Sequence, residues 1–242
     1  MRFQYFLAAT LTALALVACD SNKPTTTTTT APTTTSSTSA PTTPATTPAT
    51  TPTTEPTEAQ AKSLSKATKP AADVSSPEKF LKVKADNLET YKYKSGLFEI
   101  DIPEGWSPTD NSKPGEAIVL WFDPTKNALI TVDIFNAPPG IDDAKMVTLL
   151  KTFLSNTFGK RPGFFMEEPI TQSDKSVQIV WGYTETIQGA TGRVQGNSFI
   201  EKVDDKVSLL TTGVLEHQFD DLKGPMSQVI NSYKVNAATK LP

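Results

Sequence analysis

The sequence predicts an α+β domain in which helices flank an antiparallel sheet. Three observations support this class. Segments between residues 98 and 215 alternate between apolar and polar residues or run apolar, as strands do. Two segments, 142–158 and 219–233, place apolar residues at helical spacing. Short turn sequences, rather than crossover helices, join most of the strand segments, and hairpin-connected strands with segregated helices are typical of α+β folds.

Residues 1–18 are predicted to be an export signal. One basic residue, Arg2, precedes an apolar run that is shorter and more interrupted than the roughly 20 residues of a membrane span. The run ends in Leu16-Val17-Ala18-Cys19, which resembles the bacterial lipobox, where cleavage precedes a cysteine that receives a diacylglycerol. We therefore expect an exported protein anchored to a membrane through lipid on Cys19. An ordinary secretory signal or an uncleaved anchor is the alternative.

Residues 19–76 are predicted to be a disordered tether. Between Thr25 and Thr57, 19 of 33 residues are Thr and six are Pro. Such a tract has too few apolar side chains to offset its chain entropy. As a coil of this length it would span roughly 40 Å, and proline would stiffen it further. A second interpretation, compatible with the first, is a stalk that carries O-linked sugars.

Residues 77–242 are predicted to form one globular domain that needs no disulfide or metal to fold. This part contains 18 basic and 22 acidic residues, a net charge of −4, with the two signs interspersed. A mixed, mildly acidic surface argues against nucleic acid as a partner. The only cysteine, Cys19, lies outside the domain, so an intrachain disulfide is excluded.

The first elements of the domain are a short helix and two strands. Ser75 and Glu78 have the spacing of a capping box, which predicts a helix within residues 75–86. A polar and aromatic strand candidate follows at 90–95. Residues 98–102 then alternate as a half-buried strand, which ends at Pro103.

A hairpin and the central helix come next. The apolar run 117–122 predicts a strand covered on both faces, and the turn 123–127 joins it to a strand at 128–135. Helical spacing then begins near Asp142 and ends at Gly159.

The rest of the domain returns to strands and closes with a helix. Strands are predicted at 164–172, 176–187, 193–202 and 206–215, with hairpin turns at 189–192 and 204–205. The closing helix covers 219–233, and we expect Gly224-Pro225 to interrupt it.

Four of these features resemble the PsbP/Mog1 superfamily and its bacterial PsbP-like lipoproteins. They are the strand "LFEIDIPEGWSP", the hairpin "AIVLWFDP…ALITVDIF", the long central helix, and the closing "VINSYKV" with its Ser232-Tyr233 pair. The resemblance covers roughly Thr90 to Val235. It implies an α/β/α sandwich around a central antiparallel sheet.

The resemblance also implies a role, because members with known roles are accessory proteins. We expect a membrane-anchored, non-catalytic accessory or assembly protein, of cyanobacterial origin, associated with photosystem II or another membrane complex. It would lie on the thylakoid lumen side or the periplasmic face of the plasma membrane. The alternative is a lipoprotein of the same fold that binds a lipidic or hydrophobic small molecule, for which a cavity beside the helical residues 146–158 would be required.

Few residues of the domain are typical of catalysis. The domain has no cysteine, one histidine and no Gly-x-Ser-x-Gly sequence. We therefore expect no enzyme activity; a hydrolase built around His217 is the alternative.

A metal site is the second chemical hypothesis. Asp220, Asp221 and His217 could supply ligands for Ca²⁺ or Mn²⁺, ions that some members of the family bind. The other acidic pairs have structural explanations as helix N-terminal charges or turn residues. We expect no required cofactor.

The three tryptophans complete the candidates. Trp121 and Trp181 lie within apolar strands and are predicted to be core residues. Trp106 follows a glycine and precedes Ser-Pro, and we expect it to be exposed as a contact anchor for a protein partner.

Overall fold

The computed structural model describes residues 62–69, 80–187 and 190–242, all of which belong to one compact unit. The predicted signal segment, Cys19 and most of the predicted tether lie outside these residues. So does the predicted capping box of Ser75 and Glu78.

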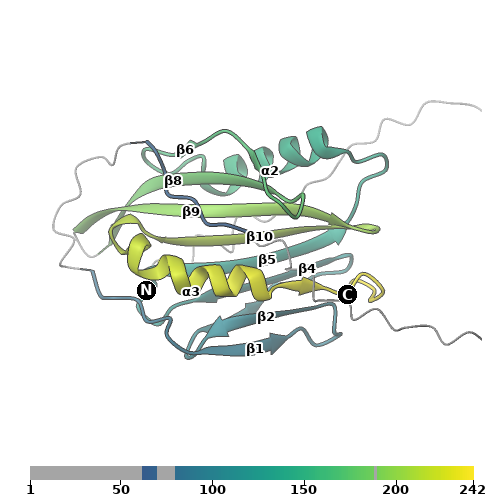
Figure 1. The fold of residues 1–242 in the computed structure, drawn as a ribbon, viewed down its shortest axis with the longest axis horizontal. Helices are drawn as coiled ribbons and strands as arrows, with labels where there is room; N and C mark the ends of the chain where they lie inside the picture. The colour runs from purple at the N-terminus through teal and green to yellow at the C-terminus, as the bar shows by residue number, and fades with distance from the viewer. Residues whose placement is uncertain (1–61, 70–79, 188–189) are drawn as a thin grey trace, which may run out of the picture. The chain divides into compact units, whose positions relative to one another are not determined.

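The strands form two antiparallel sheets (Figure 1). The small sheet has the order β1-β2-β11, with β1 (Leu88–Lys92), β2 (Phe98–Pro103) and β11 (Lys234–Val235). The large sheet has the order β3-β4-β5-β10-β9-β8-β6, and β7 also pairs with β8. Its strands are β3 (Ser107–Asp110), β4 (Glu116–Phe122), β5 (Ala128–Asn136), β6 (Phe165–Met166), β7 (Ile170–Thr171), β8 (Val177–Ile187), β9 (Ala190–Val203) and β10 (Lys206–Leu215).

Helices cover the large sheet on opposite faces. Helix α2 (Asp143–Phe158) packs on β8 and β9, while α3 (Phe219–Ser232), preceded by the short helix η2 (Glu216–Gln218), packs on β10 and β2. The apolar contacts therefore separate into two clusters, one on each face. This arrangement confirms the predicted α+β class with helices flanking an antiparallel sheet. Among the described residues, no helix is long and apolar enough to cross a membrane.

The turn between β4 and β5 shows how side chains stabilise the hairpins. Asp123 is buried and accepts hydrogen bonds from the hydroxyl and backbone N–H of Thr125 and from the N–H of Ala128, the last at 2.7 Å. Lys126 takes a left-handed conformation with φ of 64°. The turn thus sets the register in which β4 and β5 pair.

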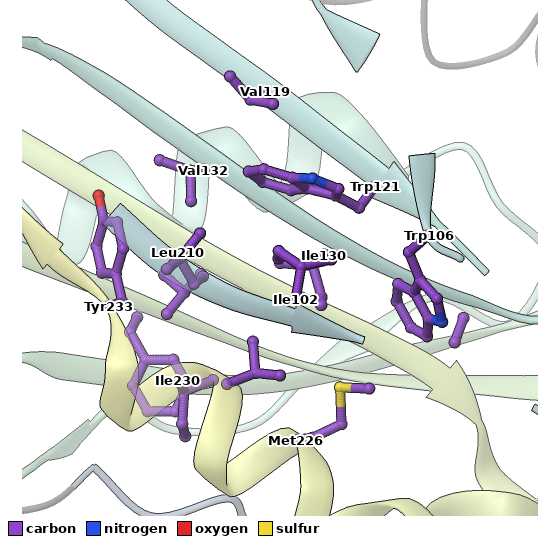
Figure 2. Packing of buried hydrophobic residues seen from close by; sticks show 14 of the residues in the cluster. Ile102, Trp106, Val119, Trp121, Ile130, Val132, Leu210, Met226, Ile230 and Tyr233 are labelled. Carbon is purple, nitrogen blue, oxygen red and sulfur yellow. The ribbon is translucent and has the colours of Figure 1, made fainter. Parts of the chain in front are cut away.

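The strand that ends in Pro-Glu-Gly-Trp begins the core of the α3 face. Phe98, Ile100 and Ile102 point inward from β2, and Gly105 turns the chain with φ of 83°. Trp106 then enters the same cluster as residues of α3, as Figure 2 shows. The stretch is a corner of the fold.

Two helix predictions are wrong in part. Residues 81–86 are extended, because their backbone groups bond to other parts of the domain: the Val83 N–H donates to Gln218 Oε1, and the Leu81 carbonyl accepts from Asn127. Helix α3 continues through Pro225. Proline removes one helical hydrogen bond, but the apolar stripe on both sides of it packs against the sheet and outweighs that loss.

The face under α2 is filled by aromatic rings. Phe158 of α2 stacks on Trp181 with ring centroids 4.2 Å apart, and the indole N–H donates to Ser198 Oγ at 2.9 Å. Gly196 and Gly213 lie under the same indole; an added Cβ at Gly196 would collide with the ring, and one at Gly213 would be in tight contact with it. Trp121 and Trp181 are both buried, which confirms that they are core residues.

We predict that Gly196→Ala lowers the free energy of unfolding by roughly 1–3 kcal/mol, because the added Cβ would overlap the Trp181 ring. Gly213→Ala is the matched control: its Cβ would lie 3.3 Å from Cη2 of the same ring and should have the smaller effect. Urea unfolding of both variants measures the difference. A Gly196→Ala protein as stable as wild type would contradict this packing.

Candidate functional site

Trp106 does not offer a contact surface. Its side chain lies in the core with 5% of the residue exposed, and the indole N–H donates to the Lys84 carbonyl at 3.1 Å. The prediction that Trp106 is exposed is therefore wrong. The glycine before it turns the ring inward, and the extended segment 81–86 supplies the acceptor for its N–H.

The predicted metal ligands are not brought together. His217 packs against the Phe80 ring at 5.6 Å, whereas Asp220 and Asp221 pair with lysines. Within the part of the chain that the structure describes, no group of three or more His, Cys, Asp or Glu could hold a metal ion. Burial lowers the pKa of His217 and so favours the neutral ring.

The space beside α2 that a hydrophobic ligand would need is occupied by side chains. Met146, Leu150, Leu154 and Phe158 all face the sheet and are buried. Together with the stacked Trp181 they form the apolar cluster on this face.

The structure instead shows a site that was not predicted, at the end of the predicted tether. Residues 62–69, which we call the strap, run extended over β8 and β9 on the face opposite α2. The strap groove is the surface they occupy: Gln178, Gln195 and Asn197 form its floor, and Asp174, Glu201, Glu167 and Asp220 form its rim. For residues 62–69 the prediction of disorder is wrong.

The floor of the groove binds the main chain of the strap. The Ser65 N–H donates to Asn197 Oδ1 at 3.0 Å, and the Ser65 carbonyl accepts from Asn197 Nδ2 and Gln195 Nε2, both at 3.1 Å. Gln178 Nε2 donates to the Ser63 carbonyl at 2.9 Å. The three amide side chains are at most 1% exposed. Without the strap, their buried hydrogen-bonding groups would lose these partners.

One apolar side chain anchors the strap. Leu64 is 4% exposed and belongs to the cluster under α3. A void of about 10 Å³ remains beside it, lined by residues that include Gln195 and Met226. A void of this size holds at most one water molecule, so the strap packs closely on the domain.

The first residue of the strap is fixed by charge and by its backbone. The Lys62 ammonium lies 2.8 Å from Asp174 and 3.2 Å from Glu201. The Lys62 N–H donates to Asn231 Oδ1 of α3 at 2.8 Å, and its carbonyl accepts from Asn231 Nδ2 at 3.0 Å. The strap is thus held between the strands and α3.

Weaker contacts hold the other end. Lys66 pairs with Asp220 at 2.6 Å at the surface, and the Thr68 N–H donates to Glu167 at 2.5 Å. The Lys69 ammonium lies 5.2 Å from the centre of the Phe165 ring, within the range of a cation–π contact. A basic strap therefore lies on an acidic rim.

The ion pairs at Lys62 shift the pKa values of both partners. Burial acts against the charge of Asp174, but hydrogen bonds from Lys62 and from the hydroxyl and N–H of Ser176 hold the pKa of Asp174 below its ordinary value. Burial likewise lowers the pKa of Lys62, but Glu201 and Asp174 together raise it by more. Each charged form is thus favoured in the folded protein.

A signal for the strap is present in the sequence. Leu64 is the first large aliphatic residue after Val17, and Lys62, Lys66 and Lys69 end a long stretch without lysine. A second signal lies in β8 and β9: Gln178 interrupts the apolar start of β8, and Gln195 and Asn197 alternate at spacing two on one face of β9.

Comparison with known proteins returns similar folds only among solved structures; no family model and no curated protein matches the sequence. A cyanobacterial PsbP from Synechocystis is 15% identical, with a TM-score of 0.43, and the match covers 62% of this chain and 92% of that one. Mog1p of Saccharomyces cerevisiae, a Ran-binding protein, is 9% identical, with a TM-score of 0.43 and coverage of 62% and 95%. LpqN of Mycobacterium tuberculosis, involved in cell envelope biogenesis, is 14% identical, with a TM-score of 0.40 and coverage of 62% and 91%.

We predict that strap attachment weakens in acid. Because the pKa of Asp174 in the folded protein lies below its unfolded value of about 4, its contribution to stability is present above about pH 4 and is lost as the pH falls through the folded pKa. Wild type should exceed Asp174→Asn in free energy of unfolding by roughly 1–3 kcal/mol at neutral pH. This difference should shrink toward zero below about pH 4.

Urea unfolding of the full chain across this pH range measures the difference. Asp220→Asn is the control, because its partner Lys66 is also on the strap but the Asp220 side chain is 73% exposed; its effect should be smaller. A pH-independent difference for Asp174→Asn would contradict the role of the ion pair.

Proposed function

We propose that the protein is exported, is held at a membrane by lipid on Cys19, and acts as a non-catalytic accessory or assembly protein for a membrane complex. The observation that carries the proposal is the strap. A tether that served only as a spacer would need no residues bound to the domain. Here residues 62–69 are bound to one face of the sheet, so a tether anchored at Cys19 would hold the domain at a defined attachment point.

The ionisable side chains named above make structural contacts, which favours a role in binding over one in catalysis. Asp174 and Glu201 pair with Lys62, Asp142 caps α2, and His217 packs on an aromatic ring. These contacts use such groups for structure. The interspersed surface charge favours a protein partner over nucleic acid. Photosystem II, which the family resemblance names, is one candidate complex.

The anchor is tested by Cys19→Ser in the full chain, expressed with an affinity tag in a cyanobacterial host. We expect wild type in the membrane fraction and the variant released or unprocessed, because serine cannot carry the thioether-linked lipid. Ser21→Ala, which leaves Cys19 in place, should behave as wild type.

The accessory role is tested in the same strains after solubilisation in detergent. Subunits of one membrane complex should co-purify with wild type and be reduced or lost with Cys19→Ser. The proposal fails if Cys19→Ser is processed to the size of wild type and still stays at the membrane, or if wild type brings down no membrane complex.

A further inference from the structure

The strap leaves two buried polar groups beside its groove without partners. Gln195 is fully buried and uses Nε2 on the strap, but its Oε1 has no hydrogen-bond partner. Arg193 lies two residues earlier on β9 and therefore on the same face of the sheet. It is 5% exposed, its Nε is 3.5 Å from Glu216, and its Nη2 has no partner. The groove thus contains one acceptor without a partner, Gln195 Oε1, and one donor without a partner, Arg193 Nη2.

Arg193 lies at the Lys69 end of the groove. Its guanidinium lies 4.5 Å from the centre of the Phe165 ring, the ring that Lys69 also approaches. A bound segment with a carbonyl or carboxylate at Arg193 would satisfy the Nη2 donor, which has no hydrogen-bond partner. Such a bond to a buried guanidinium is among the stronger hydrogen bonds in proteins.

The groove recognises features that another polypeptide can supply. Its amide side chains bind the strap through main-chain N–H and carbonyl groups, which every extended segment carries. Two buried positions select side chains: the acidic pair Asp174 and Glu201 selects a basic residue, and the pocket at Leu64 selects an apolar one two residues later.

We propose that the strap groove is a docking site for an extended basic segment of a protein partner, and that the strap occupies the groove until the partner displaces it. The segment carries a basic residue at the place of Lys62, an apolar residue at the place of Leu64, and an acceptor that reaches Arg193. This inference rests on the proposed function and names the surface through which the accessory protein would bind its complex.

The strap is suited to being replaced. It is short, with a single well-buried apolar side chain, and its Lys66 contact is at the surface. As part of the same chain it competes at an effective concentration of roughly millimolar. A free segment therefore binds wild type weakly, and binds tightly only when the strap is weakened.

The test uses a fluorescent peptide of residues 60–70, QAKSLSKATKP, and the full chain with Lys62→Ala and Leu64→Ala in its own strap. Fluorescence anisotropy should show saturable binding to this variant with an apparent Kd at least about tenfold lower than for wild type. Adding Asn197→Ala should remove the gain. A scrambled peptide of the same composition and charge should not bind.

Cooperative thermal unfolding checks that the variant is folded, and Leu64→Ala alone replaces the double variant if it is not. As an independent measurement, excess peptide should shift the NMR signals of the Gln195 and Asn197 side-chain amides in wild type. The inference is overturned if the folded variant does not bind, or binds the scrambled peptide equally well. Either result leaves the Cys19 test of membrane attachment unaffected, so the two failures are distinguishable.

Discussion

The hydrogen bonds between three buried amide side chains and the main chain of the strap determine what can cover β8 and β9. Gln178, Gln195 and Asn197 lie side by side on adjacent strands at fully buried positions where apolar residues would ordinarily lie. An apolar helix laid over them would leave several buried donors and acceptors unpaired, each at roughly 1–3 kcal/mol. An extended chain supplies both kinds of group at every residue. For this reason α3 packs on β10 and β2, and the strip over β8 and β9 belongs to the strap.

The surface under α2 and the strip under the strap therefore differ in kind. Under α2 the contacts are aromatic and aliphatic, with Phe158 stacked on Trp181 and with Gly196 beneath the indole, where an added Cβ would overlap the ring. Packing of this sort specifies one arrangement of side chains. Under the strap the contacts are main-chain hydrogen bonds and ion pairs with one apolar anchor, Leu64. The side chains under α2 form closed packing, whereas the strip under the strap presents hydrogen-bonding groups that a related segment could share.

Strands and helices could be predicted where the spacing of apolar residues follows which side chains are buried. The alternation of residues 98–102 and the apolar run 117–122 gave strands with nearly correct bounds, as did the helical spacing that ends at Gly159. The orientation of Trp106 could not be predicted, because it depends on an acceptor carbonyl in a segment, 81–86, that itself looked helical. The strap was missed for a related reason. Its few apolar residues carry no period, and the groups that order it lie more than 100 residues away in the chain.

Amide hydrogen exchange of the full chain shows whether the strap is bound in its groove. The N–H groups of Ser63 and Ser65 donate to Gln172 and Asn197, and so should exchange at least about tenfold more slowly than amides of an unstructured peptide of the same sequence. The matched measurement is the Asn197→Ala chain, in which Ser65 should lose most of its protection. Exchange of both amides at the unstructured rate in the wild-type chain would contradict the account.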